Sequence, residues 1–227
     1  MQWLIDLLML FFPSNCLVCG LRLHAPGDIL CFICELEMPR TGFGDFENNP
    51  VSKIFWGRVR VSAGTSLFRF EKGSAYQTLL HDLKYRGNRR AGLYLGRLLG
   101  QELMNTSLAD SDLMVPVPLH RLRLKRRGFN QSELIARGAS EITGIPVANH
   151  LLKRHSYQHS QTTMNRQERF ENMAAAFTLG NNAPDLHEKK ILIIDDIITT
   201  GATLEACSQV MLSQFKCLVY IATVSYA

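Results

Sequence analysis

The stretch that most constrains the fold is KILIIDDIITTGATL at residues 190–204. Residues 191–194 form an unbroken apolar run, which is typical of a strand covered on both faces of a sheet. Asp195 and Asp196 close this run, and a turn of small and hydroxyl residues follows. From Leu204 onward, apolar residues recur at helical spacing, so a helix is expected to begin within the turn. The stretch therefore predicts a strand, an acidic pair, a turn and a helix in an α/β protein.

The turn and the acidic pair predict two different binding roles. A turn at a helix N-terminus presents free backbone N–H groups and threonine hydroxyls, which bind phosphate. This turn consists of Thr199, Thr200, Gly201, Ala202 and Thr203. Asp195 and Asp196 would repel a phosphate, so we assign them to sugar hydroxyls, directly or through a divalent cation. The alternative is a buried strand whose acids only cap the next helix, which requires neither two adjacent acids nor this turn.

The same segment resembles the loop that binds 5-phosphoribosyl 1-pyrophosphate (PRPP) in type I phosphoribosyltransferases. In that family, paired acids hold the 2′- and 3′-hydroxyls of ribose, and the turn holds the 5′-phosphate. The resemblance implies that Asp195 and Asp196 bind the ribose and that residues 199–203 bind the phosphate. It also implies a catalytic role for the two acids in a transfer reaction, because they would stabilise a cationic, oxocarbenium-like ribose in the transition state.

Length and composition predict one principal domain with a small N-terminal addition. A chain of 227 residues can hold one α/β domain of about 150 residues and a short module. Hydrophobic residues make up 46% of the chain, which suits a packed core and argues against a disordered protein. We expect a helix and a cysteine module at residues 1–40, a linker at 38–50 and the larger domain at 55–227.

Residues 1–13 are apolar but do not have the pattern of a secretory signal. They lack basic residues before the apolar run and a small-residue cleavage site after it, and they contain Asp6. The run is also too short to span a bilayer. Pro13 is expected to end a docking helix, and attachment to a membrane surface is the alternative. We expect a cytoplasmic protein and favour docking over membrane attachment.

Two Cys-x-x-Cys pairs near the N-terminus predict a structural metal site. Cys16 and Cys19 form the first pair, and Cys31 and Cys34 form the second. Four thiolates from two tight turns suit a tetrahedral Zn²⁺ with no open position, so the ion is expected to hold the fold rather than to react. A disulfide pair is disfavoured in a chain that we expect in a reducing compartment. An iron–sulfur cluster is a further alternative.

Two basic segments are candidates for anion binding. The first is Lys84-Tyr85-Arg86-Gly87, at the end of a predicted helix. The second, at residues 120–131, carries five cations in seven residues directly after a predicted strand, where α/β proteins bind ligands. A solvated basic surface is the ordinary alternative for such a run. We assign Lys84 to PRPP, and we assign pyrophosphate or the phosphates of DNA to Arg86, Arg121, Arg126 and Arg127.

Aromatic rings lie beside both basic segments in the sequence. Tyr85 belongs to the first segment, and Phe129 follows the cations of the second. Cations that follow a phosphate backbone, together with rings that stack on bases, are typical of a single-strand site with little sequence preference. The same cations can bind pyrophosphate with Mg²⁺, which prefers oxygen ligands. We therefore expect that PRPP and single-stranded DNA can compete.

The rest of the chain predicts further elements of an α/β domain. Apolar periodicity predicts helices at residues 74–84, 91–104 and 131–142 and strands at 112–118, 151–154, 174–179 and 217–225. Apolar and polar side chains alternate over residues 58–70, which predicts two strands joined by a turn at Gly64. The polar stretch at 155–172 has almost no periodicity and is long for a simple connection, so we expect a lid or a binding loop there.

Taken together, the motifs resemble the ComF family, which includes ComFC and GntX-like proteins. The resemblance rests on the cysteine pairs, HDLKYRG at 81–87, VPVP at 115–118, RGFNQ at 127–131 and the acidic pair with its turn. The matching residues of the long loop are Gln161, Arg169 and Asn172. The resemblance implies a type I phosphoribosyltransferase-like fold, with a mainly parallel sheet flanked by helices, behind an N-terminal four-cysteine zinc module.

The family resemblance also implies a role in natural transformation. Members support the movement and handling of incoming single-stranded DNA, in some bacteria alongside a helicase-like partner. Three functions stay open: a competence protein with a PRPP pocket and a DNA-binding surface, an active phosphoribosyltransferase on a small nucleophile, and a non-catalytic PRPP sensor. Hypoxanthine-type enzymes place an acid where this chain has Thr199. A threonine is no general base at neutral pH, so purine salvage is not expected.

Overall fold

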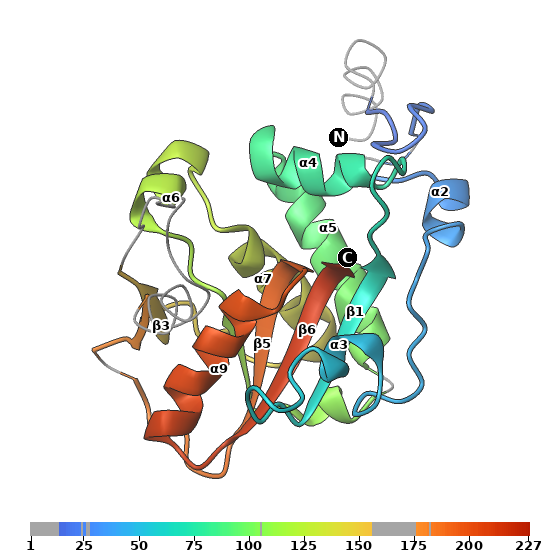
Figure 1. The fold of residues 1–227 in the computed structure, drawn as a ribbon. Helices are drawn as coiled ribbons and strands as arrows, with labels where there is room; N and C mark the ends of the chain where they lie inside the picture. Colours follow the sequence, from blue (N-terminus) through green and yellow to red (C-terminus); the bar gives the residue numbers. More distant parts are fainter. Residues whose placement is uncertain (1–13, 24, 26–27, 105, 156–175, 182) are drawn as a thin grey trace, which may run out of the picture.

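A four-stranded parallel sheet organises the protein (Figure 1). The computed structural model describes residues 14–23, 25, 28–104, 106–155, 176–181 and 183–227. The strand order is β1-β6-β5-β2, and all three neighbouring pairs are parallel. The strands are β1 (Ala63–Arg69), β2 (Leu113–Pro116), β5 (Lys190–Ile198) and β6 (Leu218–Tyr226).

Helices cover both faces of this sheet. On one face lie α5 (Arg89–Leu103) and α7 (Gln131–Thr143), and on the other lie α3 (Pro50–Lys53) and α9 (Ala202–Gln214). The central strand β5 alternates between two hydrophobic clusters, since Leu192 and Ile194 pack with α5 and α7 while Ile191 and Ile193 pack with α9. A strand buried on both faces reads as a continuous apolar run. The predicted fold class, a mainly parallel sheet flanked by helices, is therefore confirmed.

The remaining elements surround the sheet. They are α2 (Phe32–Leu36), α4 (Gln77–Tyr85), a short 3₁₀ helix (Ser107–Asp110), α6 (Arg121–Arg127), β3 (Leu152–Arg154) and β4 (Phe177–Leu179). Strands β3 and β4 pair antiparallel in a separate small sheet. Helices α4, α5 and α7 occupy the predicted stretches with ends shifted by a few residues. In the part of the chain that the structure describes, no helix has the length and the apolar content needed to cross a bilayer.

Residues 58–70 do not form the two strands that were predicted. They contain a single strand, β1, in which Gly64 pairs with Ile221 of β6 instead of making a turn. The glycine is needed for another reason, because a Cβ at this position would lie 3.0 Å from Cγ1 of Val51 in α3. A glycine within a strand here marks the close approach of a helix.

Strand β5 is longer than its apolar run predicted. Its ladder with β6 continues past Asp195 to Ile198, which pairs with Tyr226. The backbone N–H of Ala227 then donates to the carbonyl of Ile198 at 3.0 Å. The acidic pair therefore lies within the strand rather than after it, because β6 supplies backbone partners further along the chain.

The stretch at 38–50, which was predicted as a linker, runs beside the sheet. Arg40 forms an antiparallel bridge with Phe68 of β1, and the N–H of Thr41 donates to the carbonyl of Leu67 at 3.1 Å. Asn49 is buried and caps α3 through hydrogen bonds from the N–H groups of its first turn. The proposed division of the chain into residues 1–40 and 55–227 stays a prediction, and the predicted N-terminal docking helix lies outside the described residues.

Helices α5 and α7 approach each other closely at two glycines. A Cβ at Gly96 would lie 2.2 Å from the carbonyl oxygen of Ile135, and a Cβ at Gly138 would lie 2.2 Å from that of Leu93. Such distances leave no room for a side chain, so the two helix backbones are in direct contact. The position of α7, and of the polar residues at its start, is thereby fixed relative to the sheet.

Candidate functional site

The acidic pair lies at a junction of three elements. Ser132, in the first turn of α7, donates its hydroxyl to Oδ1 of Asp195 at 2.8 Å, and the N–H of Asp196 donates to the same oxygen at 2.9 Å. Nζ of Lys84, at the end of α4, lies 3.1 Å from Oδ2 of Asp196. The sequence predicted that Lys84 contacts a ligand. In the structure, this residue already has a carboxylate partner within the candidate site.

Burial changes the acidity of Asp195. Loss of solvent, and then the neighbouring charge of Asp196, raises the pKa of Asp195 to about 7, while the hydrogen bond from Ser132 opposes this shift. A carboxyl with this pKa changes its charge close to neutral pH. Its ability to accept hydrogen bonds from hydroxyl groups is then sensitive to pH.

The turn between β5 and α9 presents an uncapped helix N-terminus. Gly201 precedes α9 with φ of 74°, and no side chain of the described residues caps the helix there, whereas Asn130 caps α7 and Asn88 caps α5. A Cβ at Gly201 would lie 2.5 Å from Cγ2 of Ile54, so both the positive φ and the packing require glycine. Thr199 and Thr200 are exposed, and Ala202 and Thr203 are partly buried. The predicted turn therefore has backbone N–H groups available to an anion.

Arg58 is a polar residue of this region that sequence reasoning missed. Its Nη1 donates to the carbonyl of Thr200 at 2.8 Å, and its Nη2 forms an ion pair with Glu205 of α9. The residue lies in a stretch for which the sequence predicts a strand, and a lone arginine there carries no motif. The one available signal was its position close to an apolar pair, Ile54 and Phe55, which packs against the turn.

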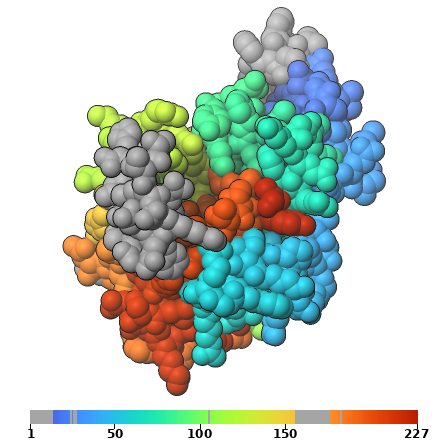
Figure 2. All heavy atoms as spheres, viewed as in Figure 1, coloured from blue at the N-terminus to red at the C-terminus, as the bar shows by residue number. Residues whose placement is uncertain are grey.

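The two basic segments meet in one cavity of about 390 Å³. It is formed by the end of α4 and the turn after it, together with the end of α6. The lining residues are Lys84, Tyr85, Arg86, Gly87, Arg126, Arg127 and Phe129. On the face seen in Figure 2, atoms from the ends of β5 and β6 (orange and red) lie in a recess between the region of α4 above and the segment after α3 below. Of the predicted phosphate-binding cations, Arg121 begins α6, is exposed and does not line the cavity.

The charges of this cavity are partly compensated. Arg86 lies 3.3 Å from the buried Asp82, and the guanidinium of Arg127 lies 5.5 Å from the ring centroid of Tyr85. Lys84 also reaches Asp196, as described above. Cations with one weak or shared partner retain donors for a phosphate. The cavity can therefore hold an anion beside the acidic pair.

Phe129 does not supply the stacking ring that the sequence suggested. Its side chain is only 8% exposed and belongs to the hydrophobic cluster of α5 and α7, with the guanidinium of Arg89 at 5.4 Å from its ring centroid. The connection from α6 to α7 turns the ring inward, where its burial is favourable. Tyr85, which is 60% exposed, is the ring of this region that a base could reach.

Part of the RGFNQ motif at residues 127–131 has a structural role. Gly128 ends α6 in a left-handed conformation, with φ of 76°. Asn130 caps α7 and also donates its side-chain amide to the carbonyl of Val117 at 2.9 Å, just beyond the end of β2. The motif therefore aligns the start of α7, from which Ser132 reaches Asp195. The other predicted loop residues, Gln161, Arg169 and Asn172, lie outside the described residues.

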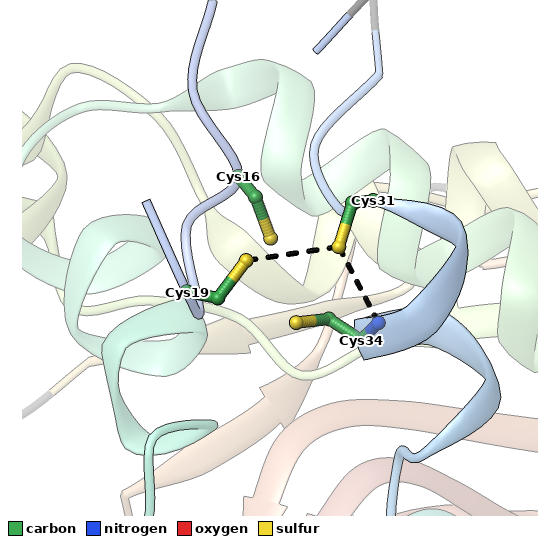
Figure 3. Close-up of side chains that lie close together, drawn as sticks. All are labelled: Cys16, Cys19, Cys31 and Cys34. Atoms are coloured by element: carbon green, nitrogen blue, oxygen red, sulfur yellow. Dashed lines mark hydrogen bonds between the residues drawn. The ribbon is translucent and has the colours of Figure 1, made fainter. Parts of the chain in front are cut away.

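The four N-terminal cysteines form one cluster, in which the sulfurs point toward one another (Figure 3). All four Sγ atoms lie within 4.8 Å of one another, and Sγ of Cys19 is 3.7 Å from that of Cys31. A single ion with Zn–S bonds of about 2.3 Å would hold its four sulfurs roughly 3.8 Å apart. A four-iron cluster spreads its thiolates over separate irons and needs a wider arrangement. No disulfide is present among the described cysteines, so the geometry fits one tetrahedral metal ion.

The surroundings of the cysteines favour a thiolate at one position. Although burial alone would raise the pKa of Cys16, hydrogen bonds from the backbone N–H groups of Cys19, Cys31 and Val18 lower it to about 6 overall. Burial raises the pKa of Cys34 instead. A bound dication stabilises every ligating thiolate, and it would offset this cost of burial.

Comparison with known proteins places these features in a family. Residues 90–226 match the family model described as "Phosphoribosyl transferase domain", which includes the acidic pair, its turn and α6. Competence protein F of Haemophilus influenzae is 32% identical over 220 residues, covering 90% of this chain and 93% of that protein. The DNA utilization protein YhgH of Salmonella typhi is 33% identical over 138 residues, or 59% of this chain and 60% of that protein. Competence protein ComFC of Bacillus subtilis is 32% identical over 104 residues, which cover 46% of this chain and 40% of that protein.

Replacing Cys16 by serine should remove a bound metal ion and destabilise the N-terminal module. Metal binding supplies folding free energy to so small a module, so we expect a loss of more than about 2 kcal/mol in stability. Elemental analysis of the purified protein should give about one zinc per chain in the wild type and far less in the variant. Cys217→Ser, which lies outside the cluster, serves as the control and should retain the ion. A wild type without near-stoichiometric metal contradicts the prediction.

Replacing Asp195 by asparagine should stabilise the protein more at about pH 8 than at about pH 5. The pKa of Asp195 is about 7 in the folded protein against an ordinary 3.8, so between these values the unfolded chain releases a proton that the folded chain retains. The wild type therefore loses stability as pH rises through this window. Asparagine keeps an oxygen for Ser132 and does not ionise. The difference in melting temperature between variant and wild type should grow up to neutral pH, and a constant difference would contradict the assignment.

Proposed function

This chain belongs to the ComF family of proteins with a phosphoribosyl transferase domain, and we propose that it binds PRPP and handles incoming single-stranded DNA in natural transformation. One observation carries the proposal: a carboxylate pair, an uncapped helix N-terminus and a basic cavity occur together around the end of β5. A ligand with a phosphate, a sugar and a pyrophosphate needs these three environments side by side.

The proposed orientation of PRPP follows from the charges. The 5′-phosphate binds the N–H groups and threonine hydroxyls at the start of α9. The ribose hydroxyls donate to Asp195 and Asp196, and the pyrophosphate extends toward the basic cavity of Lys84 and Arg126. Mg²⁺ bound with the pyrophosphate supplies charge neutralisation there. Since Lys84 lines the cavity and also pairs with Asp196, it can exchange the carboxylate for pyrophosphate when a ligand enters.

The proposed DNA site uses the same basic cavity and the surface of α6. Every residue of α6 is at least partly exposed, and Lys125, Arg126 and Arg127 form its last turn. The exposed ring of Tyr85 adds a surface on which a base can stack. A relative that carries the name DNA utilization protein supports this assignment. The family resemblance also supports a helicase-like partner. The cysteine cluster, with no open coordination position, then has a structural role as a zinc site.

Phosphoribosyl transfer is the second candidate function. Asp195 is fixed by two hydrogen bonds and lies next to a second carboxylate, an arrangement that would stabilise positive charge on ribose during loss of pyrophosphate. Release of pyrophosphate from PRPP and Mg²⁺ would support an enzyme, and release only with single-stranded DNA would connect transfer to DNA handling. Binding without release would support the sensor.

The double replacement of Asp195 and Asp196 by asparagine should weaken PRPP binding more than about tenfold, because the variant loses the charge that the ribose and its metal require. Calorimetry in the presence of Mg²⁺ measures the affinity, and a PRPP-dependent rise in melting temperature reports the same binding by mass action. Asp110→Asn with Asp112→Asn makes the same chemical change near the N-terminal end of β5 and should leave the affinity unchanged. Equal binding by both double variants would refute the assigned ribose site.

The second test of the function concerns DNA. We expect single-stranded DNA to bind more tightly than duplex DNA, with an affinity that falls as salt rises. Arg126→Ala with Arg127→Ala should flatten the logarithmic salt dependence by about 0.7 for each phosphate that the variant no longer neutralises. Lys189→Ala with Lys190→Ala removes equal charge at the opposite end of β5 and is the control. Fluorescence anisotropy across a salt series measures the affinity and its salt dependence for the wild type and both double variants. An absence of wild-type binding at low salt would refute the DNA assignment.

A further inference from the structure

We propose that Arg58 is a positioning residue for the phosphate-binding turn: it holds the carbonyl of Thr200 so that the N–H groups at the start of α9 face the ligand. This inference rests on the proposed function, because it concerns how the same site binds the 5′-phosphate. Arg58 lies outside the stretch that matches the phosphoribosyl transferase domain, and it follows α3 on the face of the sheet that α9 also covers.

One guanidinium connects three parts of the structure. Nη1 of Arg58 donates to the carbonyl of Thr200 at 2.8 Å and to the carbonyl of Ile54 at 3.0 Å. Its Nη2 forms an ion pair with Glu205, in the first turn of α9. Arginine is suited to this role because its planar fork presents several donors in a fixed geometry. The turn is therefore fastened to the segment after α3 on one side and to α9 on the other.

The hydrogen bond to Thr200 determines how the turn presents its N–H groups. In a trans peptide the C=O and the following N–H point in opposite directions, so a carbonyl held by Arg58 turns the N–H of Gly201 away from it. The first hydrogen bond within α9 runs from the N–H of Glu205 to the carbonyl of Gly201, at 2.9 Å. The N–H groups between these two residues thus have no acceptor within the helix. Fixing the peptide before Gly201 aligns this set of donors for a phosphate.

Packing prevents the turn from relaxing toward Arg58. A Cβ on Gly201 would lie 2.5 Å from Cγ2 of Ile54 and 3.2 Å from Cε1 of Phe55, so the turn already touches the segment that carries Arg58. Phe55 is buried and anchors that segment in the core. The guanidinium is therefore held by a rigid support, as a positioning group requires.

Arg58 also compensates a buried charge, and this second effect must be separated from the first. The side chain of Glu205 is 2% exposed, and its Oε1 has no hydrogen-bond partner among the described residues. Removing Arg58 alone would leave this carboxylate without its cation, which destabilises a protein whatever its ligand does. Neutralising Glu205 at the same time removes that penalty and leaves the carbonyl of Thr200 without its donor.

The test compares the wild type with Arg58→Met, Arg58→Met/Glu205→Gln, Glu205→Gln and Arg58→Lys. Melting temperature and affinities for PRPP, ribose 5-phosphate and pyrophosphate are measured for each protein. Arg58→Met should lower both the melting temperature and the affinity. The double variant should recover melting temperature, yet bind PRPP and ribose 5-phosphate about tenfold more weakly than the wild type. Its affinity for pyrophosphate should not change, because that group is assigned to the other end of the site.

Two variants serve as matched controls. Glu205→Gln keeps the hydrogen bond between Arg58 and Thr200, so its affinities should equal those of the wild type. Arg58→Lys retains the positive charge but not the fork, so it should preserve most of the stability and bind PRPP with intermediate affinity. A double variant with wild-type affinity for PRPP would overturn the proposal, and so would an equal loss for pyrophosphate. If the wild type itself binds no PRPP, the proposed function fails before the variants are compared.

Discussion

Two adjacent carboxylates near the end of a buried strand are electrostatically costly, and the surrounding structure compensates them from several directions. The backbone of β5 stays in its ladder with β6 through Asp195 and beyond it. A hydroxyl from α7 and an ammonium from α4 each reach one carboxylate. Loss of solvent, and then repulsion between the two acids, still raises the pKa of Asp195 to about 7. The two carboxylates can still accept further hydrogen bonds, and the hydroxyls of a ribose are suitable donors.

The compensating groups are themselves positioned by rigid contacts. Ser132 lies where it does because α7 is in backbone contact with α5 and because Asn130 attaches its start to the end of β2. Lys84 lies in the last turn of α4, lines the basic cavity and contacts Asp196, so its ammonium lies between the acids and the other cations. The acidic pair, Lys84 and the other cations of the cavity follow one another in this order, so they can bind the successive polar groups of one ligand. The same order keeps the site partly neutral when no ligand is bound.

Sequence patterns predicted the elements whose signals are local. The apolar run of β5, the turn with Gly201 and the periodicity of α9 stand next to one another in the chain, and the structure has all three. The role of Arg58 could not be predicted, because its partners Thr200 and Glu205 are more than a hundred residues away. The burial of Phe129 was missed for a related reason: a ring beside five cations looks accessible until the connection between α6 and α7 is known. The turn predicted at Gly64 is wrong. The glycine is required by the close approach of α3 to the strand, which leaves no pattern in the local sequence.

The cysteine cluster is connected to the candidate site through α4. The hydroxyl of Tyr76, which precedes α4, donates to the carbonyl of Cys34 at 2.8 Å, and that of Thr78 in its first turn donates to the carbonyl of Leu17 at 2.7 Å. The opposite end of the same helix carries Lys84 and begins the basic cavity. A helix of nine residues transmits the position of one end to the other because its backbone hydrogen bonds keep it stiff. The cysteine module therefore supports the helix that brings a cation to Asp196. A metal ion held by the four cysteines would stabilise the geometry of a site that it does not touch.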